Sequence, residues 1–110
     1  MASLSNYLRT HRKRLSLSQE EVAFLLGARG LDKGVRVCRD ENFIREPSLQ
    51  TALAYEVIYG KPVRELFAGL YAQVEREVAE RAGILRHRKT KKPKPKREEV
   101  INTISSKVTI

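Results

Sequence analysis

Apolar residues recur at helical spacing in the first part of the chain. Over residues 4–15 they alternate with Lys and Arg, which predicts a first helix with a basic outer surface. Ser18 is then followed three positions later by Glu21, the pattern of a capping box, and Gly27 comes directly after the last apolar residue. The segment 18–26 therefore predicts a second, well-capped helix.

Three further helical segments follow. Residues 35–42 offer two turns of helix, and Ser48 is a suitable N-cap for a fourth helix that runs to the break at Gly60. From Pro62, apolar residues continue at helical spacing as far as Leu85, which predicts one long fifth helix. The pattern thus indicates an all-α fold of five helices with an extended fifth helix.

The end of the chain has a different character. Residues 86–97 contain eight Lys or Arg, spaced by prolines, and predict a disordered or extended segment because they cannot bury apolar surface. Residues 98–110 are rich in β-branched side chains and predict a short strand, which would need a partner. We therefore expect a domain over 1–70, a helix extension over 71–88 and a basic, flexible tail over 89–110.

Charge and composition narrow the class of protein. The net charge is +9, and the sequence pI of about 10.1 favours a polyanionic partner. Nucleic acid is favoured over a membrane because no long apolar segment is present. The lack of an apolar leader and the single Cys38 suggest a cytoplasmic, nucleoid-associated protein. We expect that the protein is not an enzyme and has no cofactor or metal site. The sequence shows no nucleophile with a nearby base, no paired carboxylates and no cluster of metal ligands.

Four stretches follow one another in register: "LRTHRKRLSLSQEEVAFLLG", "VRVCRDE", "REPSLQTALAYEVIYG" and "KPVRELF". From about Leu8 to Phe67 the chain resembles the Cro/repressor-type (XRE) helix-turn-helix domains of bacterial and phage regulators. In that family the second helix lies across the DNA backbone and the third enters the major groove, commonly from a dimer. The resemblance implies a sequence-specific transcriptional regulator, first of all a repressor, that binds double-stranded DNA as a homodimer.

The resemblance also implies roles for single residues. Gln19 stands where the family has a Gln that touches a phosphate at the start of the second helix. Arg12 and Glu41 stand where members often pair an Arg with a Glu inside the domain, and we interpret them as a structural ion pair. That pair would anchor the third helix to the first.

Base contacts are expected from the third helix. The candidates are Lys33, Arg36 and Arg39, because Lys and Arg reach guanine O6 and N7, and Arg36 is preferred for its early place in the helix. The chain between the second and third helices is longer than the family's turn by about four residues. Either a longer loop precedes a normal third helix, or the third helix begins earlier; Gly30 and Gly34 favour the loop.

Further phosphate contacts are expected from basic side chains outside the helices. Arg29 would lie on the lengthened turn, and the tail would add sequence-independent affinity through counterion release. The tail candidates are Lys89, Lys91, Lys92, Lys94, Lys96 and Arg97.

A heptad-like spacing marks a possible dimer contact in the fifth helix. Its members are Tyr71, Val74, Val78 and Leu85, which two subunits could share, or which could simply continue the domain core. A rival to the regulator is an antitoxin-type interaction protein that binds a protein partner through residues 98–110 or 71–85 and autoregulates through DNA. A third alternative is a sequence-indifferent nucleic-acid binder.

Overall fold

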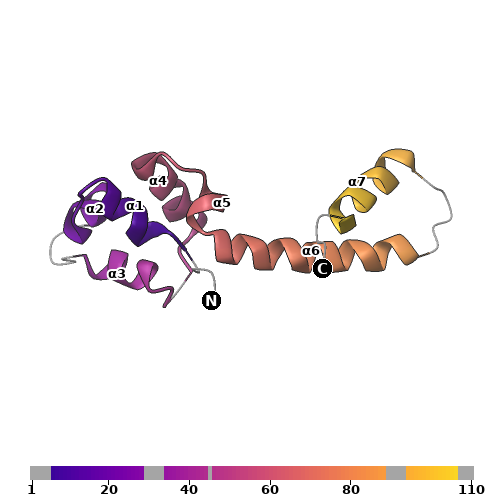
Figure 1. Ribbon diagram of the computed structural model, residues 1–110, viewed down its shortest axis with the longest axis horizontal. Coiled ribbons are helices and arrows are strands. Elements are labelled where there is room, and N and C mark those ends of the chain that lie inside the picture. Colours follow the sequence, from indigo (N-terminus) through magenta and orange to yellow (C-terminus); the bar gives the residue numbers. More distant parts are fainter. Residues whose placement is uncertain (1–5, 29–33, 45, 89–93, 107–110) are drawn as a thin grey trace. The chain divides into compact units, whose positions relative to one another are not determined.

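The computed structural model describes residues 6–28, 34–44, 46–88 and 94–106, and every regular element in these ranges is a helix (Figure 1). The helices are α1 (Leu8–Arg14), α2 (Gln19–Leu25), α3 (Val35–Glu41), α4 (Leu49–Tyr59), α5 (Val63–Leu66), α6 (Ala68–His87) and α7 (Pro95–Ser106). The all-α class expected from the pattern is therefore present. The chain divides into two compact units, Met1–Leu70 and Tyr71–Ile110.

Local capping explains where α2 and α4 begin. The Ser18 hydroxyl accepts a hydrogen bond from the Glu21 amide at 3.0 Å, and the Glu21 carboxylate accepts one from the Ser18 amide at 2.8 Å. This reciprocal pair is the predicted capping box. Ser48 accepts from the Thr51 amide at 3.2 Å at the start of α4, and Gly60 ends that helix with φ of 68°.

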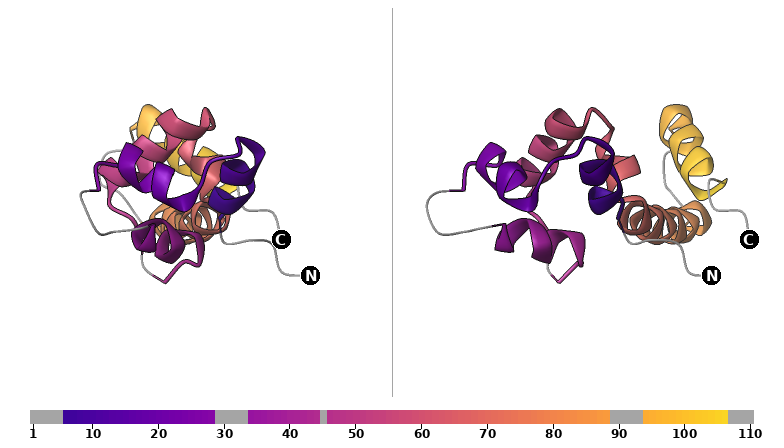
Figure 2. Two further views of the ribbon diagram at one scale, coloured as in Figure 1. Left: turned by 90° about the vertical axis from the view of Figure 1, so that its left-hand side faces the viewer. Right: turned by 60° about the vertical axis from the view of Figure 1, so that its left-hand side comes forward.

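The first unit encloses a single apolar core built from α1 to α5. Its buried members are Leu8, Val22, Ala23, Val37, Ala52, Tyr55, Tyr59, Leu66 and Phe67. The views in Figures 1 and 2 place α3 below α1 and α2, so that α3 supplies Val37 to this core from one side. The hydrogen bond from the Tyr7 amide to the Leu66 carbonyl, 2.7 Å, joins the beginning of the unit to its end.

The single long fifth helix of the prediction is wrong. The helix is interrupted at Phe67, whose backbone has φ of −115° and ψ of 47°, so that α5 and α6 are separate. The break lets the Phe67 ring lie in the core, with its centroid 6.2 Å from that of Tyr55 in an edge-to-face arrangement. Core packing, which periodicity alone does not contain, therefore overrides the helical spacing at this point.

The predicted strand over 98–110 and the flexible tail over 89–110 are wrong for residues 95–106, which form α7. Pro95 occupies the first helical position, where its missing N–H is no disadvantage, and Glu98 follows in the first turn, where the helix dipole favours an acid. Ile101 and Ile104 are three residues apart, a helical rather than an alternating spacing. The β-branched composition of this segment predicts a strand, whereas the spacing of its isoleucines fits the helix that the structure shows.

Small residues of α6 and an isoleucine of α7 form the buried part of the second unit. Ala79, Ala82 and Ile101 are all less than a tenth exposed. An apolar groove beside them is lined by Tyr71, Val74, Glu75, Val78 and Ile104. Helix α7 therefore supplies one wall of a groove whose other wall is the Tyr71 to Val78 part of α6.

Candidate nucleic-acid interface

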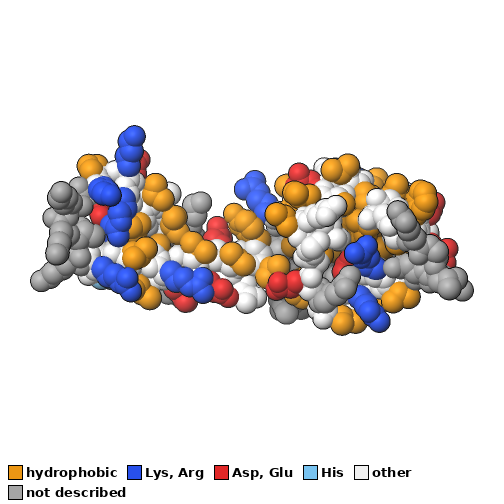
Figure 3. All heavy atoms as spheres, turned by 180° about the vertical axis from the view of Figure 1, so that it is seen from behind, with side chains coloured by type: hydrophobic (Ala, Val, Ile, Leu, Met, Phe, Trp, Pro, Cys, Tyr) orange, Lys and Arg blue, Asp and Glu red, His pale blue; other side chains and the backbone are white. Residues whose placement is uncertain are grey.

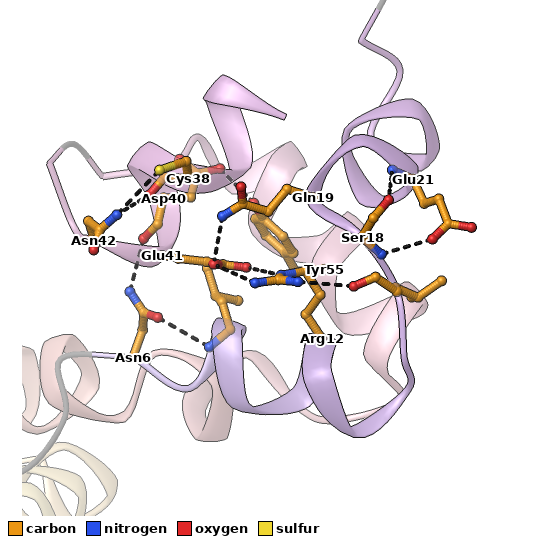
Figure 4. A network of polar contacts seen from close by, with 12 residues as sticks. Asn6, Arg12, Ser18, Gln19, Glu21, Cys38, Asp40, Glu41, Asn42 and Tyr55 are labelled. Carbon is orange, nitrogen blue, oxygen red and sulfur yellow. Dashed lines mark hydrogen bonds and ion pairs between the residues drawn. The ribbon is translucent and has the colours of Figure 1, made fainter. Parts of the chain in front are cut away.

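The side chains of Arg12 and Glu41 lie together between α1 and α3 (Figure 4). Arg12 Nε donates to Glu41 Oε2 at 2.6 Å and Nη2 donates to Oε1 at 3.3 Å, while Nη1 donates to the Leu17 carbonyl at 3.0 Å. The two side chains are 12% and 3% exposed, so this bidentate pair is largely removed from water. The hydrogen bond to Glu41 raises the pKa of Arg12 above its ordinary value. The pair predicted from the sequence thus ties α3 to α1.

Gln19 completes a three-residue network with this pair. Its Nε2 donates to Glu41 Oε1 at 3.1 Å, so the first residue of α2 is joined to the last residue of α3 (Figure 4). The sequence assigned Gln19 to a phosphate, and the structure gives its amide an internal partner. Only one of the two amide hydrogens is used by this bond, because a carboxamide carries two donors.

A buried carboxylate fixes the other side of α3. Asp40 is fully buried, and its Oδ2 accepts a hydrogen bond of 2.7 Å from the Tyr55 hydroxyl of α4. Asn6 Nδ2 donates to the Asp40 carbonyl at 3.0 Å, and Asn6 Oδ1 accepts from the Leu8 amide at 3.1 Å. Burial, and then the bond to Asp40, raise the pKa of Tyr55 above its ordinary range. Sequence reasoning missed this network; its one signal is an acid on the inward face of α3, three residues after Val37.

Gly34, the N-cap of α3, lies against the beginning of α2. It has φ of 84°, and a Cβ built on it would lie 2.7 Å from Gln19 Cβ and 2.9 Å from the Gln19 carbonyl carbon. Only glycine fits both the left-handed backbone and the contact. Helix α3 therefore begins at Val35, and the lengthened turn predicted before it includes Gly30, Arg29 and Lys33, which lie outside the described residues.

The outward face of α3 carries the side chains that remain accessible. Arg39 and Asn42 are exposed, Val35 is 50% exposed and Arg36 is half-buried. Asn42 Nδ2 donates back to the Cys38 carbonyl at 2.8 Å. Of the predicted base contacts, Arg36 and Arg39 therefore share this face with two residues that sequence reasoning did not single out. The sequence signal that could have found Val35 and Asn42 is their spacing of four and three residues from Arg39, which puts them on the same side of a helix.

A polar pocket opens where α1, α2 and α3 meet. Its lining combines cationic, amide, hydroxyl, thiol and carboxylate groups from the three helices and their caps, namely Arg9, Arg12, Ser18, Gln19, Cys38, Glu41 and Asn42. Arg9 and Asn42 are exposed at this pocket, whereas Glu41 lies at its base in the pair with Arg12. The exposed part of the pocket therefore presents hydrogen-bond donors beside the outward face of α3.

The predicted tail contacts are described in part. Lys94 and Lys96 are exposed, and Arg97 Nη1 is 2.6 Å from Glu98 Oε1 in a half-exposed pair at the beginning of α7. Lys89, Lys91 and Lys92 lie outside the described residues.

The expected dimer residues on α6 are exposed: Tyr71 is 45%, Val74 46%, Val78 40% and Leu85 37% exposed. Three of these four also line the groove that Ile104 shares.

Comparison with models of protein families, with curated proteins and with solved structures found no match for the chain. No helix in the described ranges is long and apolar enough to cross a membrane. Within the same ranges, no group of three or more His, Cys, Asp or Glu side chains is placed to hold a metal ion.

Proposed function

We propose that the protein is a sequence-specific DNA-binding regulator of transcription, a repressor that binds as a dimer and reads the major groove with α3. The observation that carries the proposal is the way α3 is held. Arg12 and Gln19 bind its last residue, Glu41, and Tyr55 binds Asp40, so that its inward face is fixed by α1, α2 and α4. A short helix of two turns does not persist alone, and such anchoring keeps it rigid for recognition.

The chemistry of the outward face suits base edges. Arg39 and Arg36 would donate to guanine O6 and N7, Asn42 would pair with adenine N6 and N7, and Val35 would contact a thymine methyl group. These four side chains cover one face of α3 at spacings of three and four residues. We place them in the groove, and we add Val35 and Asn42 to the base contacts expected from the sequence.

Phosphate contacts would flank this face. Arg9 lies at the polar pocket with Gln19, and the remaining amide hydrogen of Gln19 could reach a phosphate while the other binds Glu41. Lys94 and Lys96 would add affinity for any sequence, because each phosphate neutralised releases counterions. Specificity is thus assigned to α3 and general affinity to the surrounding cations.

The test begins with selection of bound sequences from a random pool of duplex DNA by the full chain. Affinity for the selected duplex and for a scrambled one is then measured for Arg36→Ala and Arg39→Ala. Each should lose about 1–3 kcal/mol on the selected duplex and little on the scrambled one. Lys13→Ala, an exposed position on α1, is the matched control. Equal affinity of the unaltered protein for both duplexes would refute sequence-specific reading and favour the sequence-indifferent binder.

Neutralising the cations near α7 gives a different expected result. The double variant Lys94→Gln, Lys96→Gln should weaken both duplexes alike and lower the slope of log K against log salt by about 0.9 for each phosphate contact removed. A loss confined to the selected duplex would contradict the division of roles between α3 and the cations.

The apolar groove of the second unit favours one other function. Tyr71, Val74, Val78 and Ile104 form a surface that a helix or strand of another protein could cover, as expected for an antitoxin-type interaction protein. Co-purification of one specific protein with the full chain, lost on Val74→Glu and kept on Arg36→Ala, would support this alternative.

A further inference from the structure

Helix α2 carries an apolar surface that the first unit leaves uncovered. Phe24 is 76% exposed and Leu25 is 53% exposed, although both side chains are large and apolar. They line one pocket together with a leucine and two carboxylates, and we call this lining the α2 surface: Leu17, Glu20, Glu21, Phe24 and Leu25. Groups of hydrophobic side chains beside charged ones are visible on the surface of the protein in Figure 3. Adjoining apolar side chains with a charged border are typical of a binding site for another molecule.

The α2 surface lies on the side of the helix that faces away from the core and from α3. Val22 and Ala23 are buried in the core, and Gln19 binds the last residue of α3. Because an α-helix has about 3.6 residues per turn, Phe24 and Leu25 point in the opposite direction. A molecule bound to the α2 surface therefore leaves the contacts that hold α3 undisturbed.

The α2 surface is acidic although the protein as a whole is basic. Residues 15–28 contain two Glu and no Lys or Arg, whereas the net charge of the chain is +9. Glu20 and Glu21 are both exposed. The hydrogen bonds with Ser18 lower the pKa of Glu21 below its ordinary value, so this carboxylate stays ionised at neutral pH. The local charge therefore favours a cationic molecule, unlike the charge of the rest of the chain.

We propose that the α2 surface binds a helix of a different protein, one that carries Lys or Arg beside an apolar stripe. The stripe would cover Phe24 and Leu25, and the cations would meet the two carboxylates. Exposed aromatic side chains are frequent anchors of such contacts, and charges at the border select the partner and its orientation. Glu20 and Phe24 lie four positions apart, as do Glu21 and Leu25, and rows of this spacing pack into the grooves of another helix.

The charge of the α2 surface argues against other molecules at this place. The carboxylates would repel the phosphates of a nucleic acid and of an anionic membrane. A second copy bound through the same surface would bring four carboxylates together. The chain's own basic segment 86–97 suits the carboxylates, but two prolines are its only apolar residues, so it could not cover Phe24 and Leu25. A different protein that combines cations with apolar side chains has both features that the surface requires.

The first test is selection of binders to the full chain from a display library of helical peptides with random surface positions. The selected helices should carry Lys or Arg beside an apolar stripe. We expect dissociation constants in the micromolar range, because the surface is smaller than the roughly 800 Å² that each partner buries in a standard interface. Phe24→Ser should weaken binding about tenfold or more. Changes in amide chemical shifts should be centred on α2.

The controls separate loss of the contact from loss of the fold. Leu49, Leu53 and Val57 form another exposed apolar row, on α4, and Val57→Ser should leave binding of the selected peptide unchanged. Phe24 and Val57 are both more than three-quarters exposed, so neither change should affect folding, and circular dichroism checks this.

Reversal of one charge tests the acidic border. Glu20→Lys should weaken the selected peptide about fivefold or more, and a peptide with Glu in place of its basic residues should bind this variant better than it binds the unaltered protein. Glu20 is the better choice for this change because Glu21 also caps α2. A merely structural role of Glu20 would not produce this exchange of preference.

A photoreactive analogue of phenylalanine at position 24 identifies the natural partner in extracts of the cells that produce the protein. The cross-linked segment, identified by mass spectrometry, should belong to a different protein and contain Lys or Arg beside apolar residues. The same analogue at position 57 should not capture that segment.

Three results would overturn the proposal. They are selected helices without an excess of basic residues, binding that survives Phe24→Ser, and cross-linking of position 24 to this chain itself. The peptide measurements contain no DNA, and Phe24→Ser should still distinguish the selected DNA duplex from the scrambled one. Failure of this proposal can therefore be told from failure of the proposed function.

Discussion

Removal of the Arg12 guanidinium should destabilise the first unit strongly. In Arg12→Met, Glu41 stays in a place where its side chain is 3% exposed and keeps only the Gln19 amide as a hydrogen-bond donor from the network, while the Leu17 carbonyl loses its donor. Breaking a buried ion pair by removing one partner costs about 3–5 kcal/mol, because the remaining charge is uncompensated. A unit of this size has a total stability of only about 3–10 kcal/mol, so most of it is at risk.

The assay is urea unfolding of the full chain followed by far-UV circular dichroism, with the free energy of unfolding obtained by linear extrapolation. The double variant Arg12→Met, Glu41→Leu should be more stable than Arg12→Met alone, by about 1–4 kcal/mol, because it removes both charges from the interior. Lys13→Met, an exposed position on the same helix, should change stability by less than about 0.5 kcal/mol and serves as control.

Two results would refute this reasoning. If Arg12→Met were no more destabilising than Lys13→Met, the pair would be solvated in solution and would not anchor α3. If the effects of Arg12→Met and Glu41→Leu simply added in the double variant, the two side chains would not be coupled. Either result would also remove the argument that α3 is rigidly held for recognition.

Two further predictions concern the turn before α3 and the pH dependence of stability. Gly34→Ala should destabilise the protein by more than Gly27→Ala. Both glycines have positive φ, for which an L-residue costs about 1–2 kcal/mol, but only at Gly34 would the new Cβ also meet Gln19. Thermal unfolding compares the two variants, and equal losses of stability would contradict the close approach. Burial, and then the charge of Arg14, lower the pKa of His11 below 6.5, so the unfolded chain binds the proton more readily and the free energy of unfolding should fall as pH drops through about 6.5. His11→Gln should flatten this pH dependence in urea titrations at pH 5 to 8. An unchanged slope would exclude His11 as its cause.

Local signals accounted for most of the first unit. Ser18 with Glu21, and Ser48 with Gly60, mark helix ends through hydrogen bonds and backbone angles that involve only neighbouring residues, so α2 and α4 were predictable. The sequence also pointed to Arg12 and Glu41 through the family resemblance, and their side chains do pair. These features depend on short stretches of chain, which a sequence shows directly.

Composition and simple periodicity do not predict the features of this chain that depend on how helices pack. The strand predicted over 98–110 from its β-branched content is wrong for residues 98–106, which belong to α7. The break at Phe67 lies inside an unbroken apolar period, and it accompanies the packing of the Phe67 ring against that of Tyr55. Asp40 could be placed on the inward face of α3, but nothing near it in the sequence indicates its partner on α4.

The sequence by itself determined that the described part of the first unit is helical, where α2 and α4 begin, and that basic residues outnumber acidic ones. Each of these features depends on residues that are close together in the sequence or on the number of charged residues. The sequence shows both directly. Only the tertiary structure decided that Asp40 meets Tyr55, that Gln19 binds Glu41, and that one side of α4 remains uncovered. These depend on which helices touch, and contacts between residues far apart in sequence are set by how all the helices pack at once.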